Sequence, residues 1–261
     1  MFNKFINIFQ IIQKKLNNFL YFFGFILETI INLLLFFKQK QVTVAVLLRQ
    51  ILFTGFESLG LIAVTAVIIS GMVIIQGNSI TPNFISSPLI YTILISIVTR
   101  ELSTLLTALF VVSRSGAAIA TELGNMVLNE EVDSLLSIGI SPFTYLVIPR
   151  LIGVVISVFV LSVYFNIFGL LGSALLTQAI YDLPFSSFIN NAFAELSFID
   201  VASSSIKAIL FGFVISIICS YHGLKVSNAL TEVPQRTSKA VVQSIGTIVI
   251  IDILVSVLFY V

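Results

Sequence analysis

The chain has 261 residues, of which 58% are hydrophobic and only 10% are charged, and its formal net charge is +1 at pH 7. A soluble domain carries about 25% charged residues, and no run of Lys and Arg indicates a nucleic-acid surface. The single cysteine, Cys219, excludes an internal disulfide. With a mean hydropathy of +1.12, this composition predicts an all-α polytopic membrane protein.

Residues 1–48 are predicted to form an N-terminal interfacial amphipathic region. Within residues 1–15 the apolar residues recur at helical spacing, with lysines on the other face. A small-residue cleavage site is lacking, so a signal peptide is not expected. Residues 16–37 are long enough to span a membrane, but Asn17, Glu28 and Asn32 interrupt them, which favours a helix lying in the headgroup layer.

Residues 49–261 are predicted to form a transmembrane domain with five spans. Each apolar block reaches the roughly 20 residues that a transmembrane helix needs, and the blocks cover residues 52–76, 89–113, 145–176, 201–222 and 240–261. The connections are a short polar loop at 77–88, a polar region at 114–144, a second polar loop at 177–200 with room for a short helix, and a short loop at 223–239.

The basic residues give the orientation. If the N-terminus is cytoplasmic, that side holds all of the 13 Lys and Arg residues except Arg100 and Lys207. The outer loops then hold none, as the positive-inside rule requires. Five spans place Val261 on the outer side.

Four charged residues fall inside the predicted spans: Arg100, Glu101, Lys207 and Asp252. Ionisable groups in hydrocarbon are unfavourable, so they face partners or a wet cavity and often mark function. Arg100, Lys207 and Asp252 have similar predicted depths, and we expect Arg100 or Lys207 to pair with Asp252, with Glu101 as a second carboxylate. A structural ion network and a direct substrate role both fit this pattern.

A short amphipathic helix is predicted at 130–138. Its polar residues include Glu130, Glu131 and Asp133, and Gly139 with Pro142 supplies the stop signal. By spacing alone it could be a solvated connecting helix.

Motifs for catalysis or nucleotide binding are lacking in the sequence. It contains no GxxxxGK[ST], HExxH or CxxC. His222, the sole histidine, could serve a serine hydrolase with Ser113 or Ser115, but a GxSxG elbow is missing. We therefore expect no enzyme activity, no cofactor and no metal site.

Four segments in order resemble the MlaE family of ABC-transporter permeases: RQILFTGFESLGLIAVTAVIISGMVIIQ, TRELSTLLTALFVVSRSGAAIATELGNM, EEVDSLLSIGISPFTYLVIPR and IKAILFGFVISIICSYHG. The resemblance implies a homodimeric permease that moves phospholipid or related lipid. It also implies a cytoplasmic or stromal ATPase and an MCE-domain lipid-binding protein on the opposite face. The location would be a bacterial inner membrane or a chloroplast envelope membrane.

The resemblance also favours an ATPase-coupling role for Glu130, Glu131, Asp133, Gly139 and Pro142, because this segment resembles the coupling loop of ABC permeases. An ion- or proton-coupled secondary transporter that uses the intramembrane charges is the alternative. A membrane enzyme acting on lipids would need a reactive cluster that the sequence does not contain.

Overall fold

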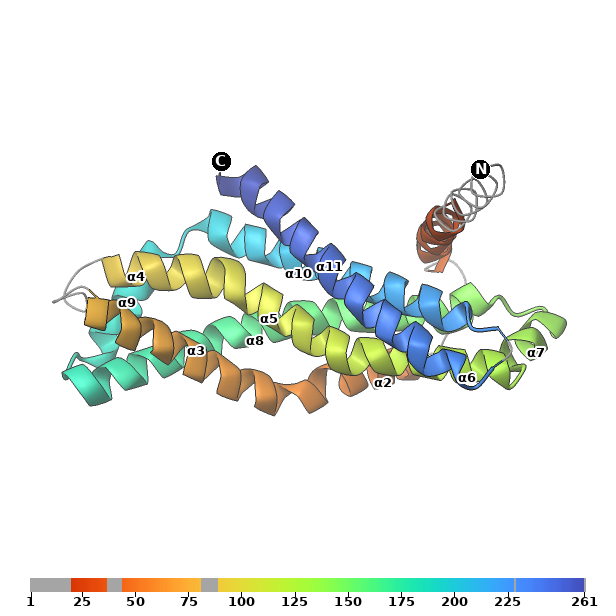
Figure 1. Cartoon of the computed structure of the whole chain (residues 1–261). Helices are drawn as coiled ribbons and strands as arrows, with labels where there is room; N and C mark the ends of the chain where they lie inside the picture. Colours follow the sequence, from red (N-terminus) through yellow and green to blue (C-terminus); the bar gives the residue numbers. More distant parts are fainter. Residues whose placement is uncertain (1–19, 37–43, 81–88, 228, 261) are drawn as a thin grey trace, which may run out of the picture.

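The computed structural model describes residues 20–36, 44–80, 89–227 and 229–260, and every regular element within them is a helix (Figure 1). Among these residues, five helices are long and apolar enough to cross a membrane: Ala45–Ser79, Ile90–Leu128, Phe143–Tyr181, Phe198–Leu224 and Glu232–Tyr260. A shorter apolar helix, Leu20–Phe36, precedes them. The predicted fold class, an all-α membrane protein with five transmembrane helices, is confirmed.

The first two spans are composite helices. The first consists of α2 (Val44–Gly55), a 3₁₀ turn (Phe56–Ser58) and α3 (Leu59–Ile80). The second consists of α4 (Leu89–Leu94), a π-helical segment (Ile95–Leu102), α5 (Ser103–Val111), a second π-helical segment (Val112–Gly116) and α6 (Ala117–Leu128). π-Helical turns are rare and frequently occur at functional sites.

The remaining spans are α8, α10 and α11, and two short helices connect them to their neighbours. A π-helical segment (Phe143–Val147) leads into α8 (Ile148–Tyr181), which is followed by α9 (Phe185–Glu195), α10 (Phe198–Leu224) and α11 (Glu232–Tyr260). Helix α7 (Glu131–Ser137) joins the second and third spans. Figure 1 shows α7 and α9 at opposite ends of the bundle.

The helices extend beyond the apolar blocks that predicted them. The 39 residues of Ile90–Leu128 measure about 58 Å, whereas a hydrocarbon core is about 30 Å thick. The prediction of a loop up to Lys239 was wrong, because α11 already begins at Glu232. Pro234 does not prevent this start, since the first turn of a helix does not need its N–H. Hydropathy marks the membrane-embedded part of a helix and not its ends.

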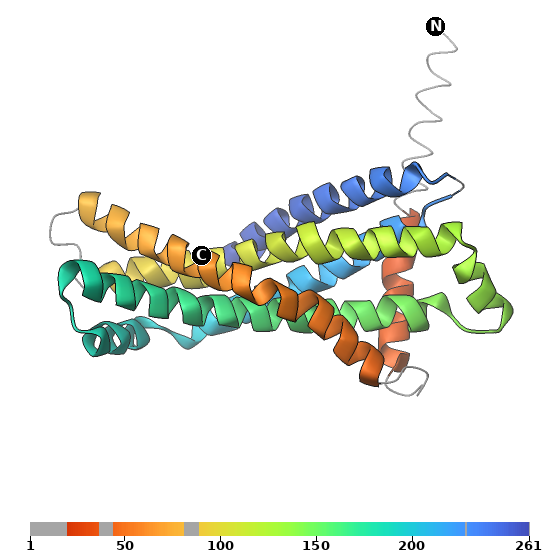
Figure 2. The same ribbon diagram turned by 90° about the horizontal axis from the view of Figure 1, so that it is seen from below.

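Helix α8 lies at the centre of the bundle, where it packs against α2, α3, α5 and α10. In its most apolar stretch 67% of the residues are buried, compared with 22% in α11. Close helix contact requires glycine at Gly212, where an added Cβ would lie 2.7 Å from the Val155 Cα. Figure 2 shows α2 and α3 crossing α8 obliquely.

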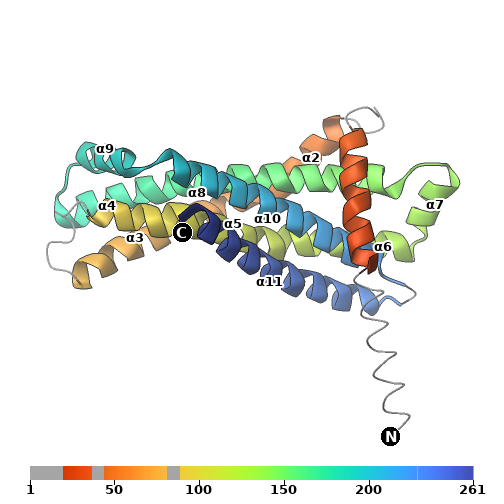
Figure 3. The same ribbon diagram turned by 90° about the horizontal axis from the view of Figure 1, so that it is seen from above.

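The helix Leu20–Phe36 lies across the bundle near the end that carries α7 (Figure 3). Its aromatic rings pack against the end of α10 and against the π-helical start of the third span. The ring centroids of Phe22 and Phe25 lie 5.0 and 5.6 Å from that of Tyr221, and the centroid of Phe25 lies 5.1 Å from that of Phe143. This transverse orientation is the one expected for an interfacial helix, whose place in the headgroup layer stays a prediction. The amphipathic segment predicted at residues 1–15 lies outside the described residues.

Candidate functional site

The ammonium group of Lys207 is the centre of a buried polar cluster. Lys207 is fully buried on α10, and its Nζ lies 2.7 Å from Glu101 Oε2 and 2.9 Å from Asp252 Oδ1. It also donates to Ser256 Oγ at 2.7 Å and to the Arg100 carbonyl at 3.3 Å. We call Lys207, Glu101, Asp252 and Ser256 the Lys207 cluster. It joins the second span to α10 and α11.

Two residues of α11 complete this cluster. Asp252 and Ser256 are four residues apart and therefore lie on the same face of the helix. The Ser256 hydroxyl donates to Glu101 Oε1 at 3.0 Å. Buried charges need such partners, because an unpaired ion in a low-dielectric interior is strongly unfavourable. Glu101 is the most accessible of the three charged members, with 36% of its side chain exposed.

A second cluster adjoins the first and is centred on Arg100. The Arg100 Nε lies 2.7 Å from the Oδ1 of Asp200, which is fully buried, and the guanidinium lies 4.5 Å from the ring centroid of Tyr260. The Tyr260 hydroxyl donates to Asp200 Oδ1 at 3.2 Å and is hydrogen-bonded to Ser203 Oγ at 2.7 Å. We call these four residues the Arg100 cluster.

Local sequence fixes Asp200 in the Arg100 cluster. Ser197 and Asp200 form a capping box at the start of α10: the Ser197 hydroxyl accepts from the Asp200 N–H at 3.3 Å, and the Asp200 carboxylate accepts from the Ser197 N–H at 3.0 Å. This box satisfies two N–H groups that a helix start would leave unpaired. The capping box therefore holds the Asp200 carboxylate in place independently of its ion pair with Arg100.

The structure brings together Glu101, Lys207 and Asp252, and places Arg100 in a separate pair with Asp200. The hydropathy pattern predicts Asp200 in an outer loop, and it gives no indication that Ser256 and Tyr260 belong to the clusters. The Ser-x-x-Asp pattern at 197–200 was the available signal for Asp200. Along α10, Lys207 lies about 14 Å from Phe198 and about 26 Å from Leu224. Both clusters therefore occupy the half of the bundle nearer α9.

At the opposite end, α7 projects from the bundle (Figure 2), and none of its residues is buried. Glu131 and Asp133 occupy its first turn, where negatively charged carboxylates interact favourably with the positive end of the helix dipole. Leu136 and Ile138 are also exposed, at 56% and 70%. The surface of α7 is thus both acidic and apolar.

Three residues flanking α7 set its orientation. Glu130 has φ of 58° and Gly139 has φ of 77°, so the chain turns sharply before and after the helix. Pro142 begins the next helical segment, where it needs no N–H partner. The helix predicted from the acidic pattern is present as α7. Pro142 lies after the end of α7 and at the start of the π-helical segment Phe143–Val147.

Ion pairs link helices near the α7 end. Arg114 pairs with Glu57 and donates to Ser58 Oγ at 3.3 Å, which joins the second span to the first. Arg150 Nη2 lies 3.0 Å from Glu122 Oε2 and joins the third span to α6. The Arg150–Glu122 pair therefore holds together the two helices between which α7 lies.

His222 has a structural partner. Its Nε2 lies 2.7 Å from the side-chain oxygen of Gln243, which joins α10 to α11. The described residues contain no group of three or more His, Cys, Asp or Glu side chains that could hold a metal ion. Cys219 is buried against Gly116.

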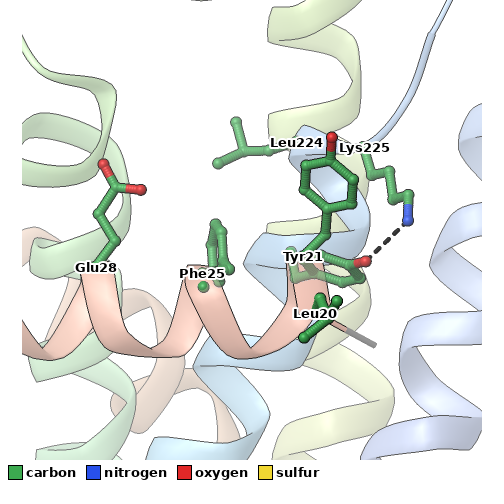
Figure 4. A pocket seen from close by; sticks show the side chains of 8 residues that line it. Leu20, Tyr21, Phe25, Glu28, Leu224 and Lys225 are labelled. Atoms are coloured by element: carbon green, nitrogen blue, oxygen red, sulfur yellow. Dashed lines mark hydrogen bonds between the residues drawn. The ribbon is translucent and has the colours of Figure 1, made fainter. Parts of the chain in front are cut away.

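A pocket of about 680 Å³ lies between the helix Leu20–Phe36 and the end of α10. Figure 4 shows Tyr21, Phe25 and Glu28 along the N-terminal helix, and Lys225 with Leu224 on the other side. The Lys225 ammonium donates to the Tyr221 hydroxyl at 2.8 Å. The pocket is a mixed aromatic and charged groove near the α7 end.

Comparison with known proteins matches most of the chain to one family. The family described as "Permease MlaE" matches residues 47–258. A protein of Rickettsia prowazekii named "probable ABC transporter permease protein" is 36% identical over 218 residues, 83% of each chain.

Two proteins from a plant and from Pyropia yezoensis are also similar. The chloroplastic protein TRIGALACTOSYLDIACYLGLYCEROL 1 of Arabidopsis thaliana is 32% identical over 82% of this chain and 61% of its own length. The probable ABC transporter permease protein ycf63 of Pyropia yezoensis is 27% identical over 94% of this chain and 93% of its own. The region matched to the family includes the Lys207 cluster, α7 and the Arg100 cluster except Tyr260.

Proposed function

The chain belongs to the MlaE permease family, and on that premise we propose that it is the membrane-spanning subunit of a lipid transporter driven by a separate ATPase. It is an ABC-transporter permease and a multi-pass membrane protein. The predicted location, a bacterial inner membrane or a chloroplast envelope membrane, agrees with its bacterial and chloroplastic relatives.

A lipid substrate is supported by the name of one relative. The Arabidopsis relative is named after a glycerolipid, trigalactosyldiacylglycerol. Phospholipid or a related lipid is therefore the substrate class that we assign.

The exposed acidic helix α7 carries the proposal that a separate ATPase drives transport. The sequence lacks a P-loop, so ATP binding is assigned to a partner subunit on the cytoplasmic or stromal face. Helix α7 offers that partner a projecting surface held by two sharp backbone turns. Glu130, Glu131, Asp133, Gly139 and Pro142 are the proposed coupling residues.

Two further partners belong to the same proposal. A second copy of the chain is assigned to the exposed face of α11, which carries Ile250, Ile253, Leu254 and Val257 at 52–63% exposure. An MCE-domain lipid-binding protein is assigned to the face that carries α9, opposite α7.

The alternative, an ion- or proton-coupled secondary transporter, would use the Lys207 cluster. In that cluster Lys207 already contacts both Glu101 and Asp252, an arrangement that also suits a structural network. Membership in an ABC-permease family favours ATP as the energy source.

Co-purification tests the proposal directly. The tagged full-length chain, expressed at its natural level in its own organism and extracted in mild detergent, should bring down a protein with a P-loop in near-equal amount. A variant with Glu130→Gln, Glu131→Gln and Asp133→Asn should lose that protein. Recovery of the chain without any ATPase, in a form that still moves lipid, would contradict the proposal.

A further inference from the structure

The pocket between the helix Leu20–Phe36 and the end of α10 has no part in the transport function proposed above. Its volume of about 680 Å³ falls within the range of ligand sites, about 300–1,000 Å³. Tyr21, Gly24, Phe25 and Glu28 line it, and their spacing of three and four residues makes them one face of the helix. At Gly24 the space is open, because no atom lies within 4 Å of an added Cβ.

This pocket has a negative end and a positive end. Figure 4 shows Glu28 at one end and Lys225 at the other, with the Phe25 ring between them. Glu28 is exposed and has no ionic partner among the described residues. A ligand of one sign alone would be repelled at one end, so the pocket suits a ligand that carries both signs.

The outward face of the same helix is apolar. Leu20, Leu27, Ile31 and Leu34 are 56–72% exposed, and their spacing places them in one stripe. Thr29, on the opposite face, is fully buried against the bundle. The stripe borders the pocket, since Leu20 also lines it. An exposed apolar stripe of this kind suits the boundary between lipid headgroups and acyl chains.

We propose that the pocket binds the headgroup of a zwitterionic phospholipid whose acyl chains lie along this apolar stripe. The phosphate would accept a charge-assisted hydrogen bond from Lys225. The ammonium would lie between the Glu28 carboxylate and the Phe25 ring, whose face attracts cations. Seven residues, about 10 Å of helix, separate Tyr21 from Glu28 and leave room for both groups.

The net charge of the lipid decides how well it fits. An anionic headgroup without an ammonium would meet Glu28 with no cation and bind more weakly. The inference rests on the predicted place of the helix Leu20–Phe36 in the headgroup layer. It does not rest on lipid being the transported substrate, because a lipid that stays bound has the same chemistry.

Tryptophan fluorescence tests this site, because the chain contains no tryptophan. The full-length Tyr21→Trp variant, which keeps an aromatic ring in the pocket, is placed in nanodiscs with a trace of phosphatidylcholine that carries a quenching spin label on its choline group. The bulk lipid is either anionic phosphatidylglycerol or unlabelled phosphatidylcholine, which competes with the probe. Quenching should be about threefold stronger in phosphatidylglycerol, the scale of one exposed charge contact.

A second position on the same helix is the control for depth. Leu34 is 72% exposed and does not line the pocket. A Leu34→Trp variant should therefore be quenched equally in the two bulk lipids, because it meets the probe only by chance encounters.

Two substitutions in the Tyr21→Trp background make the test specific. Glu28→Gln removes the charge that excludes phosphatidylglycerol, so quenching should become equal in the two bulk lipids. Gly24→Leu occupies the open space and should lower quenching to the level of Leu34→Trp. Gly60→Leu is the matched control, because its added Cβ also meets no atom and it does not line the pocket; it should keep the threefold difference.

Three results would contradict the proposal. Equal quenching of Tyr21→Trp in the two bulk lipids would show that the pocket does not select a zwitterionic headgroup. A threefold difference that survives Glu28→Gln would show that the carboxylate is not the selecting group. Quenching of Tyr21→Trp no stronger than that of Leu34→Trp in phosphatidylglycerol would show that the pocket holds no lipid and is free for a segment of protein.

Discussion

The ammonium of Lys207 lies 2.9 Å from the Asp252 carboxylate, so α10 and α11 share a buried ion pair. α11 is the least buried of the five spans, and this pair attaches it to the rest of the bundle together with the bond from Ser256 to Glu101. The Lys207 cluster therefore has a structural role that can be measured separately from transport.

Removing the charge of Lys207 should destabilise the protein more than removing the charges of a pair. Lys207→Met leaves Glu101 and Asp252 without their cation, and breaking a buried pair in this way costs about 3–5 kcal/mol. The double variant Lys207→Met with Asp252→Leu should regain part of the lost stability. Thermal unfolding in detergent measures both variants, with Arg236→Met at a half-buried ion pair within one helix as the control. A double variant less stable than the single would contradict the role of the pair.

The Arg100 cluster predicts a graded effect at Tyr260. Tyr260→Phe keeps the ring under the guanidinium and loses the bond to Asp200, which should cost about 1 kcal/mol. Tyr260→Leu also loses the cation–π contact, which adds about 0.5–2 kcal/mol. Equal unfolding temperatures for the two variants would show that the ring contact contributes nothing.

Gly212 should tolerate no side chain. Gly212→Ala places a Cβ 2.7 Å from the Val155 Cα, and that backbone can move only if α8 and α10 separate. We expect lower membrane levels and a lower unfolding temperature. Gly60→Ala is the control, because no atom lies within 4 Å of its added Cβ, and alanine favours a helix by about 1 kcal/mol over glycine. Equal behaviour of the two variants would contradict the close packing of α8 and α10.

The five spans and α7 were predictable because each has a signal in its own stretch of sequence. Apolar blocks of sufficient length report the spans, and the acidic amphipathic pattern before Gly139 reports α7. Helix ends beyond the predicted spans were not predictable from hydropathy, since the first turns of α11 are polar and α6 carries Glu122 and Asn125 among its apolar residues. The π-helical segments have no sequence signal of this kind.

The partners in the charge clusters were only partly predictable. Arg100 and Glu101 point about 100° apart on a helix, which indicates different partners. Arg100 pairs with Asp200 because the capping box at the start of α10 places that carboxylate. Ser256 bonds to Glu101 because the packing of the bundle brings α11 against the second span. Likewise, the pocket between Glu28 and Lys225 depends on two segments that only the fold brings together.

Because α7 and α9 lie at opposite ends of the bundle, we expect them on opposite sides of the membrane. In a Cys219→Ala background, Ser137→Cys on α7 and Ser187→Cys on α9, both exposed, should react with a membrane-impermeant maleimide from opposite faces. We expect labelling of Ser187→Cys from outside and of Ser137→Cys only after permeabilisation. Labelling of both from the same side would contradict the five-span topology.

Helix α7 should be needed for coupling and not for folding. Glu130→Gln, Glu131→Gln and Asp133→Asn together remove its charges without changing its size. The variant should insert and unfold like the unmodified chain, because no residue of α7 is buried. Its lipid-stimulated ATP hydrolysis with the partner subunit should fall at least tenfold. The matched control, Asp182→Asn with Glu195→Gln at the other end, should keep full activity.

The central claim is that this chain carries lipid when a separate subunit hydrolyses ATP. The most direct measurement reconstitutes the chain with its co-purified ATPase in vesicles that hold a fluorescent phospholipid, and follows the loss of that lipid from one leaflet or to an acceptor. The account predicts movement that requires both ATP and the permease, and that stops when Glu130, Glu131 and Asp133 carry no charge. Lipid movement that proceeds without ATP and follows an imposed proton or ion gradient would contradict it.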